Sequence, residues 1–408
     1  MNILYVSISF PKKEEGDNLY TDLAEELSNK HKVTVMVAEE KKKIKDTQIK
    51  NERGMEVLRV KTGNMYNVGL VEKAISYITL QSQLKLAIKK YLKDRSYDMV
   101  IFTAPPVTLT KVVKYAMKRF KCISYLMQKD IFPQNAIDIG ILKKWNPAYW
   151  YFKLKEKEIY KISTKIGCMS QGNIDYLLEN NKFLISSKLE LFPNTIKLVE
   201  NQEIECIDIR KKYGIPEKSV IALYGGNFGK PQKIEFIEEV INQYKTNENV
   251  TFIFCGKGTE KEKLFRYISN NDIKNAIMID YLPKAQYNSV LKQTDIGLIF
   301  LDDRFTIPNI PSRTLAYLEY SIPIMAATDR NTDYKDIIQN NKFGLWCESN
   351  NVTDFKEKFD YLIENEIQRK IMGKNGREFL TKNWTTDKSV NIIENTYNNL
   401  KRKDDSNV

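Results

Sequence analysis

Glycine-rich turns and a Ser-Arg pair in the second half of the chain could bind a phosphate group. Gly225-Gly226-Asn227 and Gly256-Lys257-Gly258 each follow an apolar run, and Ser312-Arg313 stands where a helix should begin. Glycine lets backbone N–H groups approach an anion, a helix start supplies unpaired N–H groups, and arginine donates paired hydrogen bonds to phosphate. Ordinary turns and a serine N-cap would explain each feature singly, but together they predict a diphosphate site.

Carboxylates offer a second kind of chemistry. Asp130 stands in a loop directly after an expected strand, where it could orient an acceptor hydroxyl or take its proton. Gly16 and Asp17 follow the first expected strand and could contact the molecule that carries this hydroxyl. A turn or cap role is the alternative for all three. Asp302 and Asp303 could be read as metal ligands, but they are adjacent and lack a third acidic partner, so we expect no metal.

Histidine and cysteine add little to this chemistry. The single histidine, His31, lies in an expected turn and is interpreted as structural, which disfavours a Ser-His or Cys-His catalytic pair. No CxxC spacing occurs, so a metal or redox motif of that kind is excluded. We expect buried, reduced thiols in a reducing compartment. The five cysteines are Cys122, Cys168, Cys206, Cys255 and Cys347.

Alternating short apolar runs and helical segments must position these residues. In the first half an amphipathic helix is expected at 18–30, after the first strand, and helical stretches separate most of the later strands. This order is typical of a doubly wound parallel sheet. The expected strands are 2–8, 33–38, 57–61, 98–103, 122–127 and 165–169.

The same pattern restarts in the second half. Residues 189–195 close the first series, and the charged stretch 198–218 suits a linker. We therefore predict a first domain at 1–196, a second at 197–383, and a last helix at 384–408 that could pack back on the first. Ligands bind at the carboxyl ends of such strands, so the crevice between the domains is the expected site. The expected strands are 220–226, 250–256, 276–282, 295–301 and 322–328.

The net charge of +12 fits an anionic substrate, an anionic membrane or nucleic acid, and composition alone does not choose. No signal peptide and no run of 18 apolar residues is found, which indicates a cytoplasmic protein. A membrane-facing surface is still expected at the inner face of the cell membrane, although both segments could instead pack on the sheet. Its apolar candidates are Leu70, Ala74, Tyr77, Ile78, Leu84, Trp145, Tyr149, Trp150 and Phe152, and its basic candidates are Lys85, Lys89, Lys90, Lys93, Lys143 and Lys144.

Five short motifs follow one another along nearly the whole chain. They are 27–35 (LSNKHKVTV), 130–133 (DIFP), 191–196 (LFPNTI), 226–232 (GNFGKPQ) and 310–317 (IPSRTLAY). In these motifs the chain resembles glycosyltransferase family 4, a group of retaining enzymes. It is most similar to the branch of bacterial L-N-acetylfucosamine transferases that build capsule and O-antigen.

The resemblance implies the GT-B architecture, two Rossmann-like domains facing a central cleft. The first domain would bind a glycan or polyprenyl-diphosphate acceptor, and the second a nucleotide-sugar donor, expected to be a UDP-sugar that carries an N-acetylated amino sugar. No cofactor is implied, and the donor's own phosphate would receive the acceptor proton. Asp130 would be catalytic. The expected donor contacts are Gly226, Asn227, Lys230, Gln232, Gly256, Gly258, Leu282, Ser312, Arg313 and Tyr317.

The chain departs from the family pattern at its charged positions. Two glutamates that are common in the family correspond to Pro308 and Ala316, and the usual arginine and lysine on the diphosphate correspond to Asn227 and Gln232. Arg313 and Lys230 are therefore the candidates to neutralise the diphosphate.

Two other functions compete with glycosyl transfer. A sugar-nucleotide epimerase can have the same architecture, but such a site usually needs several histidines and carboxylates, and His31 stands alone. A non-catalytic nucleic-acid-binding protein would interleave aromatic and basic residues, as 145–161 does. We interpret that segment as a helix with inward-facing aromatics, or one lying on a membrane, and expect no nucleic-acid partner.

Overall fold

The computed structural model describes residues 1–65, 68–198 and 207–405. The chain forms two compact units, Met1–Lys197 with Thr386–Val408, and Leu198–Thr385. Cys206 and part of the expected linker lie outside the described residues. Each unit has its own sheet and its own core.

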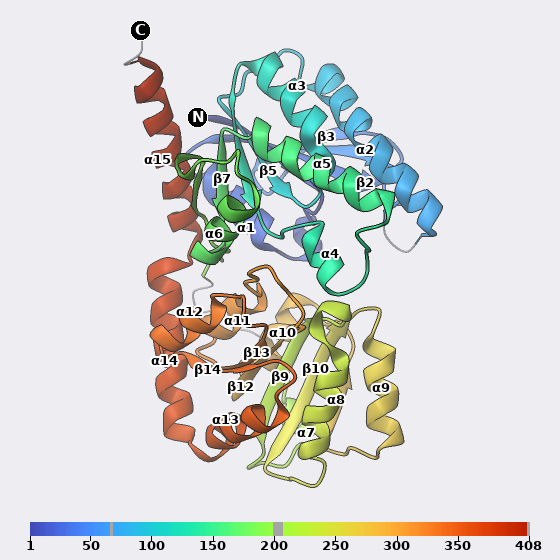
Figure 1. The fold of residues 1–408 in the computed structure, drawn as a ribbon, viewed down its shortest axis with the longest axis vertical. Helices are drawn as coiled ribbons and strands as arrows, with labels where there is room; N and C mark the ends of the chain where they lie inside the picture. Colours follow the sequence, from blue (N-terminus) through green and yellow to red (C-terminus); the bar gives the residue numbers. More distant parts are fainter. Residues whose placement is uncertain (66–67, 199–206, 406–408) are drawn as a thin grey trace. The chain divides into compact units, whose positions relative to one another are not determined.

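The first unit contains an eight-stranded sheet in the order β3-β4-β2-β1-β5-β6-β7-β8 (Figure 1). All neighbours are parallel except β3 and β4. The expected parallel sheet is confirmed here. The strands are β1 (Asn2–Ser7), β2 (Lys32–Glu40), β3 (Gln48–Glu52), β4 (Met55–Thr62), β5 (Met99–Ala104), β6 (Ile123–Gln128), β7 (Lys165–Cys168) and β8 (Leu189–Leu191).

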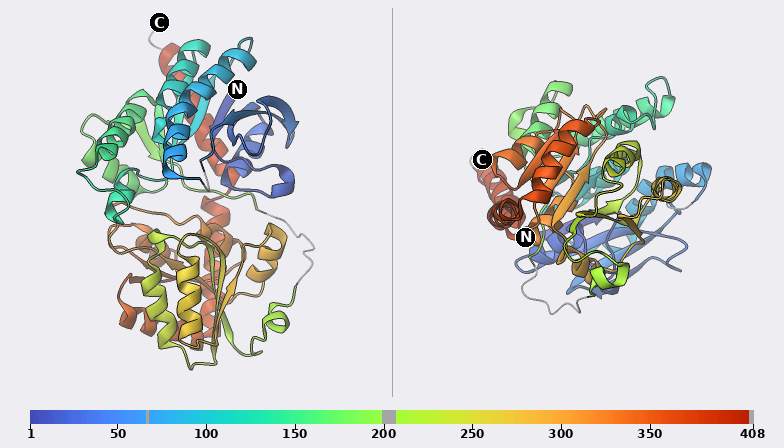
Figure 2. Two further views of the ribbon diagram at one scale, coloured as in Figure 1. Left: turned by 90° about the vertical axis from the view of Figure 1, so that its right-hand side faces the viewer. Right: turned by 90° about the horizontal axis from the view of Figure 1, so that it is seen from below.

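Helices cover both faces of this sheet because its strands are apolar on both sides. Ile3 and Tyr5 share a core cluster with helices α1 and α15, and since side chains alternate along a strand, Leu4 and Val6 face the other way. Helices α2 and α3 pack side by side (Figures 1 and 2). The helices are α1 (Leu19–Ser28), α2 (Leu70–Tyr91), α3 (Thr110–Phe120), α4 (Gln134–Asp138), α5 (Pro147–Ile162), α6 (Gln171–Asn180) and α15 (Thr386–Asp405), with 3-10 turns η1 (Lys13–Glu15), η2 (Val107–Leu109) and η3 (Ser186–Lys188).

The last helix, α15, belongs to the first unit. Thr195 and Ser389 hydroxyls lie 2.9 Å apart, and Nε2 of His31 lies 3.0 Å from the Glu394 carboxylate. His31 is therefore structural, as expected. Composition alone would predict a disordered tail from Lys401, but α15 continues through Asp405, within the last helix expected at 384–408.

The second unit has a fully parallel six-stranded sheet in the order β11-β10-β9-β12-β13-β14. A cluster of phenylalanines, including Phe236, Phe355 and Phe359, packs helices α8 and α13 onto it. The strands are β9 (Val220–Asn227), β10 (Val250–Lys257), β11 (Ala276–Ile279), β12 (Ile296–Phe300), β13 (Ile324–Thr328) and β14 (Gly344–Glu348).

Helices α8 to α12 connect these strands in sequence order, α7 precedes β9, and α13 and α14 follow β14. Helix α7 lies inside the stretch that was expected to be only a linker. The helices are α7 (Ile209–Tyr213), α8 (Ile234–Gln243), α9 (Lys261–Asn270), α10 (Lys284–Leu291), α11 (Arg313–Glu319), α12 (Tyr334–Asn340), α13 (Val352–Glu364) and α14 (Glu366–Asn383), with the 3-10 turn η4 (Lys230–Gln232).

Four of the cysteines, Cys122, Cys168, Cys255 and Cys347, are buried free thiols, as expected. Burial raises the pKa of Cys122 to about 11, so this thiol stays protonated near neutral pH. Within the described residues, no helix is both long and apolar enough to cross a bilayer.

Candidate functional site

The carboxyl ends of β9 and β10 bring two stretches of backbone close together. Gly226 and Gly256 are partners in the parallel register. A Cβ atom on Gly256 would stand 1.9 Å from the carbonyl oxygen of Gly226, and one on Gly258 would stand 2.1 Å from the carbonyl oxygen of Phe228. Only glycine fits these two positions, which also have φ of +149° and +156°. The expected glycine turns therefore meet at one edge of the sheet.

Arg313 extends its guanidinium group to this edge from the first residue of α11. The group lies 4.1 Å from the centre of the Tyr224 ring, and a Cβ on Gly226 would stand 3.4 Å from its Nη2. Nη1 is buried and has no hydrogen-bond partner among the described residues. An unpaired donor on a buried cation is costly, so the arrangement suits an incoming anion.

Two further tyrosines support the glycine turn. Tyr317 is fully buried, and its hydroxyl donates to the Leu223 carbonyl at 2.8 Å and accepts from the Gly225 N–H at 3.2 Å. Tyr317 therefore fixes the backbone behind Gly226, and its direct contact with a donor stays a prediction. Tyr287, which sequence reasoning missed, places its hydroxyl where a Gly225 side chain would stand.

The polar residues of the same segment have different roles. The side-chain oxygen of Gln232 accepts from the Gly229 N–H at 2.9 Å, so this buried residue closes the turn. Asn227 and Lys230 are exposed, and Lys230 has no ion pair within the described part of the chain. Ser312 is exposed at the N-cap of α11 and makes no side-chain capping bond, so its hydroxyl is available.

Leu282 lies beyond the end of β11, where it is half-buried in the loop before α10. The neighbouring Tyr281 is 60% exposed, and the Lys257 ammonium lies 4.8 Å from the centre of its ring. An exposed aromatic ring beside the glycine turn could stack on a nucleobase. Tyr281 lies near the carboxyl end of the expected strand 276–282, and that position is the signal that could have identified it.

The acidic pair after β12 is neutralised by neighbouring cations. Asp302 is buried and receives two hydrogen bonds from the Arg304 side chain, at 2.9 and 2.6 Å, while Asp303 pairs with Lys233. Across residues 1–65, 68–198 and 207–405, no group of three or more His, Cys, Asp or Glu side chains is placed to hold a metal ion.

In the first unit, Arg53 holds the loop of Gly16 and Asp17. Its Nη1 lies 2.7 Å from carboxylate oxygens of both Asp17 and Glu25, and its Nη2 donates to the Gly16 carbonyl. The loop is fixed by this arginine, and acceptor contact by Gly16 and Asp17 stays a prediction.

Asp130 follows β6 at the carboxyl edge of the first sheet. Asp130 is exposed as a residue, and desolvation of its carboxyl raises the pKa of that group to about 6. The adjacent Lys129 was not identified from the sequence. Desolvation lowers the pKa of Lys129 to about 7, and its ammonium lies 5.2 Å from the centre of the Phe192 ring. Two consecutive residues therefore have pKa values shifted towards neutral, a pattern common at functional sites.

The expected membrane-facing residues of α2 divide between core and surface. Leu84 is fully buried and does not face solvent, which corrects that part of the expectation. Val71, Ile75 and Ile78 are exposed and follow one another at helical spacing, and Leu86 is exposed further along the helix. The side chains of Leu70 and Ala74 lie outside the described part of the chain.

The second candidate membrane surface also divides. Trp145 and Trp150 are exposed, Phe152 is half-buried, and Tyr149 is buried against the unit, so Tyr149 does not belong to a surface patch. Lys143 lies over the Trp145 ring at 5.9 Å.

With this geometry in place, comparison with known proteins identifies the enzyme class. The family described as Glycosyl transferases group 1 matches residues 207–379, which contain the glycine turns and Arg313. A relative described as "Probable glycosyltransferase WbjE" from Pseudomonas aeruginosa is 23% identical over 312 residues, 72% of this chain and 75% of the relative. The chain is a glycosyltransferase.

Two solved structures resemble this glycosyltransferase over almost its full length. HepE of Anabaena, in complex with UDP and glucose, has a TM-score of 0.69 at 11% identity and covers 98% of this chain and 100% of its own. WaaG, a glycosyltransferase involved in lipopolysaccharide biosynthesis, has a TM-score of 0.65 at 13% identity and covers 96% and 99%. Likeness at such identity concerns the fold alone, which is the GT-B fold with two parallel-sheet units.

Proposed function

We propose that this glycosyltransferase transfers an N-acetylated amino sugar from a UDP-sugar, with retention of configuration, onto a glycan or polyprenyl-diphosphate acceptor of a bacterial surface polysaccharide. The resemblance to family 4 and to its L-N-acetylfucosamine branch supports the mechanism and the sugar class. HepE, which is similar in fold, binds UDP, and WaaG is involved in lipopolysaccharide biosynthesis. Both facts are properties of the similar proteins, and they support the choice of a UDP-sugar donor and of surface-polysaccharide synthesis here.

The observation that carries the proposal is the buried, unpaired Nη1 of Arg313 beside Gly226. A leaving nucleoside diphosphate develops negative charge as the glycosidic bond breaks, and preorganised cations stabilise that charge most where water is excluded. Lys230 is free to add a second positive charge. Backbone N–H groups at the glycine turn would complete the diphosphate contacts.

The acceptor would bind to the first unit. In the proposed mechanism Asp130 orients the acceptor hydroxyl, and the donor phosphate receives its proton, so few catalytic side chains are needed. The named relatives are glycosyltransferases, which favours transfer over epimerisation. No metal is assigned a step, and metal independence is a prediction.

Calorimetric titration with UDP, GDP, UDP-N-acetylglucosamine and GDP-mannose tests the donor assignment. We expect UDP and the UDP-sugar to bind and the guanosine compounds to bind much more weakly. NMR of the newly formed glycosidic linkage in the product then reports the anomeric configuration of the transferred sugar. An inverted linkage would contradict retention, and GDP binding tighter than UDP would contradict the donor assignment.

A further inference from the structure

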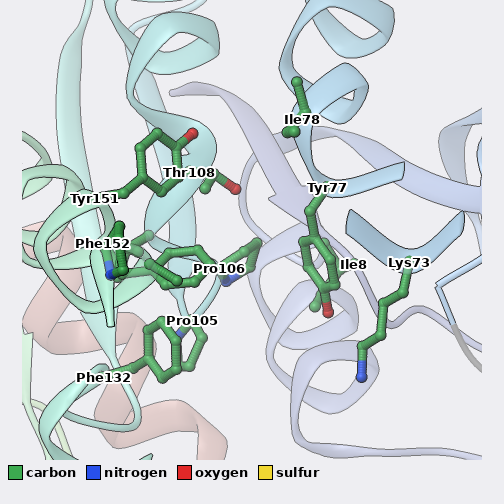
Figure 3. A pocket seen from close by; sticks show the side chains of 13 residues that line it. Ile8, Lys73, Tyr77, Ile78, Pro105, Pro106, Thr108, Phe132, Tyr151 and Phe152 are labelled. Atoms are coloured by element: carbon green, nitrogen blue, oxygen red, sulfur yellow. The ribbon is translucent and has the colours of Figure 1, made fainter. Parts of the chain in front are cut away.

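A cavity of about 670 Å³ opens in the first unit between helices α2 and α5. Figure 3 shows Tyr151, Phe152 and Phe132 on one side of it and Tyr77, Ile8 and Lys73 on the other, with prolines of the β5–η2 connection between them. Its volume is within the range of small-molecule sites, about 300–1,000 Å³. None of the residues proposed to bind the donor lines this cavity.

The chemistry of the lining favours a hydrocarbon chain. Aromatic rings, prolines and aliphatic side chains make up nearly all of it. The hydroxyl of Thr108 is buried in the lining without a partner among the described residues, and it offers one polar contact inside an apolar space. Apolar surface of this kind gains free energy when a ligand removes it from water.

Charge at the cavity indicates what the chain should carry at its end. Lys73 is the one charged residue of the lining, it is exposed, and no described residue forms an ion pair with it. An ammonium group without a carboxylate partner at the edge of an apolar cavity suits an anionic head group, such as a phosphate.

Exposed apolar side chains lie on both helices that border the cavity. On α2, Ile78 lines the cavity and is 65% exposed, and on α5, Tyr151 lines it and is 41% exposed. The exposed Val71 and Ile75 belong to a second, partly charged hollow on α2 and do not extend this one. Exposed apolar side chains mark interaction sites, and Ile78 and Tyr151 offer a hydrocarbon chain an apolar entry to the cavity.

We propose that this cavity binds a single hydrocarbon chain of the acceptor, whose anionic head group lies at Lys73. The proposal rests on the proposed function, because it narrows the acceptor of the transfer from a glycan or a lipid to a lipid. The sugar-bearing end of the acceptor stays outside the cavity. The cavity thus selects for the lipid part of the acceptor, and the donor site selects for the sugar.

Calorimetric titration with decyl phosphate, below its micelle concentration, tests this directly and needs no donor. We expect saturable binding of decyl phosphate to the full protein chain and no comparable binding of inorganic phosphate, since the decyl chain supplies most of the contact. Ala148→Trp fills the cavity from α5 and should weaken decyl phosphate by at least about tenfold. Lys157→Trp, an exposed position of the same helix outside the lining, is the matched control and should leave binding unchanged.

The contribution of the Lys73 charge to binding is tested separately. Lys73→Glu should weaken decyl phosphate by about tenfold and leave decanol binding within about twofold, whereas Lys90→Glu, exposed on the same helix, should change neither. If Ala148→Trp does not fold, Ile78→Asp places a carboxylate at the exposed mouth and should also weaken decyl phosphate about tenfold.

The outcomes separate the two proposals. Equal binding of decyl phosphate by the wild type, Ala148→Trp and Ile78→Asp would overturn the cavity assignment, as would full competition by inorganic phosphate. UDP affinity should be unchanged in every cavity variant. Absent UDP binding together with cavity-dependent binding of decyl phosphate would overturn the proposed donor and leave the chain-binding cavity standing.

Discussion

The guanidinium group of Arg313 lies over the Tyr224 ring, 4.1 Å from its centre, with Nη1 buried and unpaired among the described residues. The ring is held in turn by its hydroxyl, which donates to the Asn227 carbonyl at 2.6 Å. A cation–π contact and a fixed ring leave the guanidinium little freedom before a ligand arrives. Preorganisation of this kind lowers the entropic cost of binding an anion.

Replacing Arg313 by alanine should therefore weaken UDP binding by about 1.5–3 kcal/mol, the scale of a charge-assisted hydrogen bond. Arg266→Ala removes an exposed arginine of α9 that pairs with Glu262 and should leave UDP affinity unchanged. Calorimetry measures both variants. Equal UDP affinity in Arg313→Ala and the wild type would show that the diphosphate binds elsewhere.

Gly256→Ala should destabilise the second unit and abolish nucleotide binding, because the new Cβ would stand 1.9 Å from the Gly226 carbonyl oxygen. Gly214→Ala is the control. Gly214 also has a positive φ, +65°, but a Cβ there meets nothing within 4 Å. We expect Gly214→Ala to cost about 1 kcal/mol from backbone conformation alone, and Gly256→Ala to cost more than about 2 kcal/mol. Similar unfolding midpoints in urea would refute the close contact.

Activity should survive EDTA, because Asp302 and Asp303 are engaged by Arg304 and Lys233. Initial rates with and without EDTA, followed by addition of Mg²⁺ or Mn²⁺, measure this. Asp303→Asn should leave the rate in EDTA unchanged. Loss of turnover in EDTA that Mg²⁺ restores would mean that a metal takes part after all.

Asp130→Asn should lower kcat but raise stability at neutral pH. The carboxyl has a pKa of about 6 in the folded protein, above its ordinary value of 3.8, so the folded state binds more protons than the unfolded state between these values. Ionisation of Asp130 therefore disfavours folding increasingly as the pH rises through this window, and the full cost is present above about pH 6. An asparagine avoids that cost.

The gain in thermal midpoint of Asp130→Asn should be present at pH 7.5 and nearly absent at pH 3.5, where the carboxyl is mostly protonated in both the folded and the unfolded wild type. In the wild type kcat/KM should fall as the pH is lowered through about 6, the pKa of the Asp130 carboxyl. A pH-independent stability difference would show that the substitution acts through packing and not through the carboxyl charge.

The protein should float with vesicles rich in anionic lipid at low salt and be released at high salt, since lysines gain about 1 kcal/mol each near such a surface. Ile75→Asp together with Trp150→Asp should abolish flotation, because these side chains are 56% and 59% exposed. Leu86→Asp, on a more distant turn of α2, is the matched control. A wild-type protein that stays in solution with such vesicles at low salt would disprove the membrane contact.

The sequence by itself determined the strand series, the restart near residue 196 and the position of each glycine turn. These are local features, since runs such as VIALYGG and VTFIFCG have apolar side chains on both faces and end in glycine. Strands β3 and β14 were missed. QIKNE of β3 has a single apolar residue and is held by its pairing with β4, and β14 (GLWCE) pairs with β13 at the end of the second sheet. The helical period of α2 was identified correctly, but which of its faces is buried depends on what it packs against, so Leu84 and Ile75 could not be distinguished.

Only the tertiary structure decided which of these residues meet. Gly226 and Arg313 come together because the strand order places β12, which leads into α11, directly beside β9. The same packing directs Tyr317 inward, where its hydroxyl bonds to backbone, although its place in the motif suggested a donor contact. The cavity combines residues of α2, η2 and α5 with residues from the loops after β1 and β6, and these segments are far apart in the chain. Pattern and spacing act over a few residues, whereas these contacts depend on how whole elements pack, and that packing is fixed by the complete core.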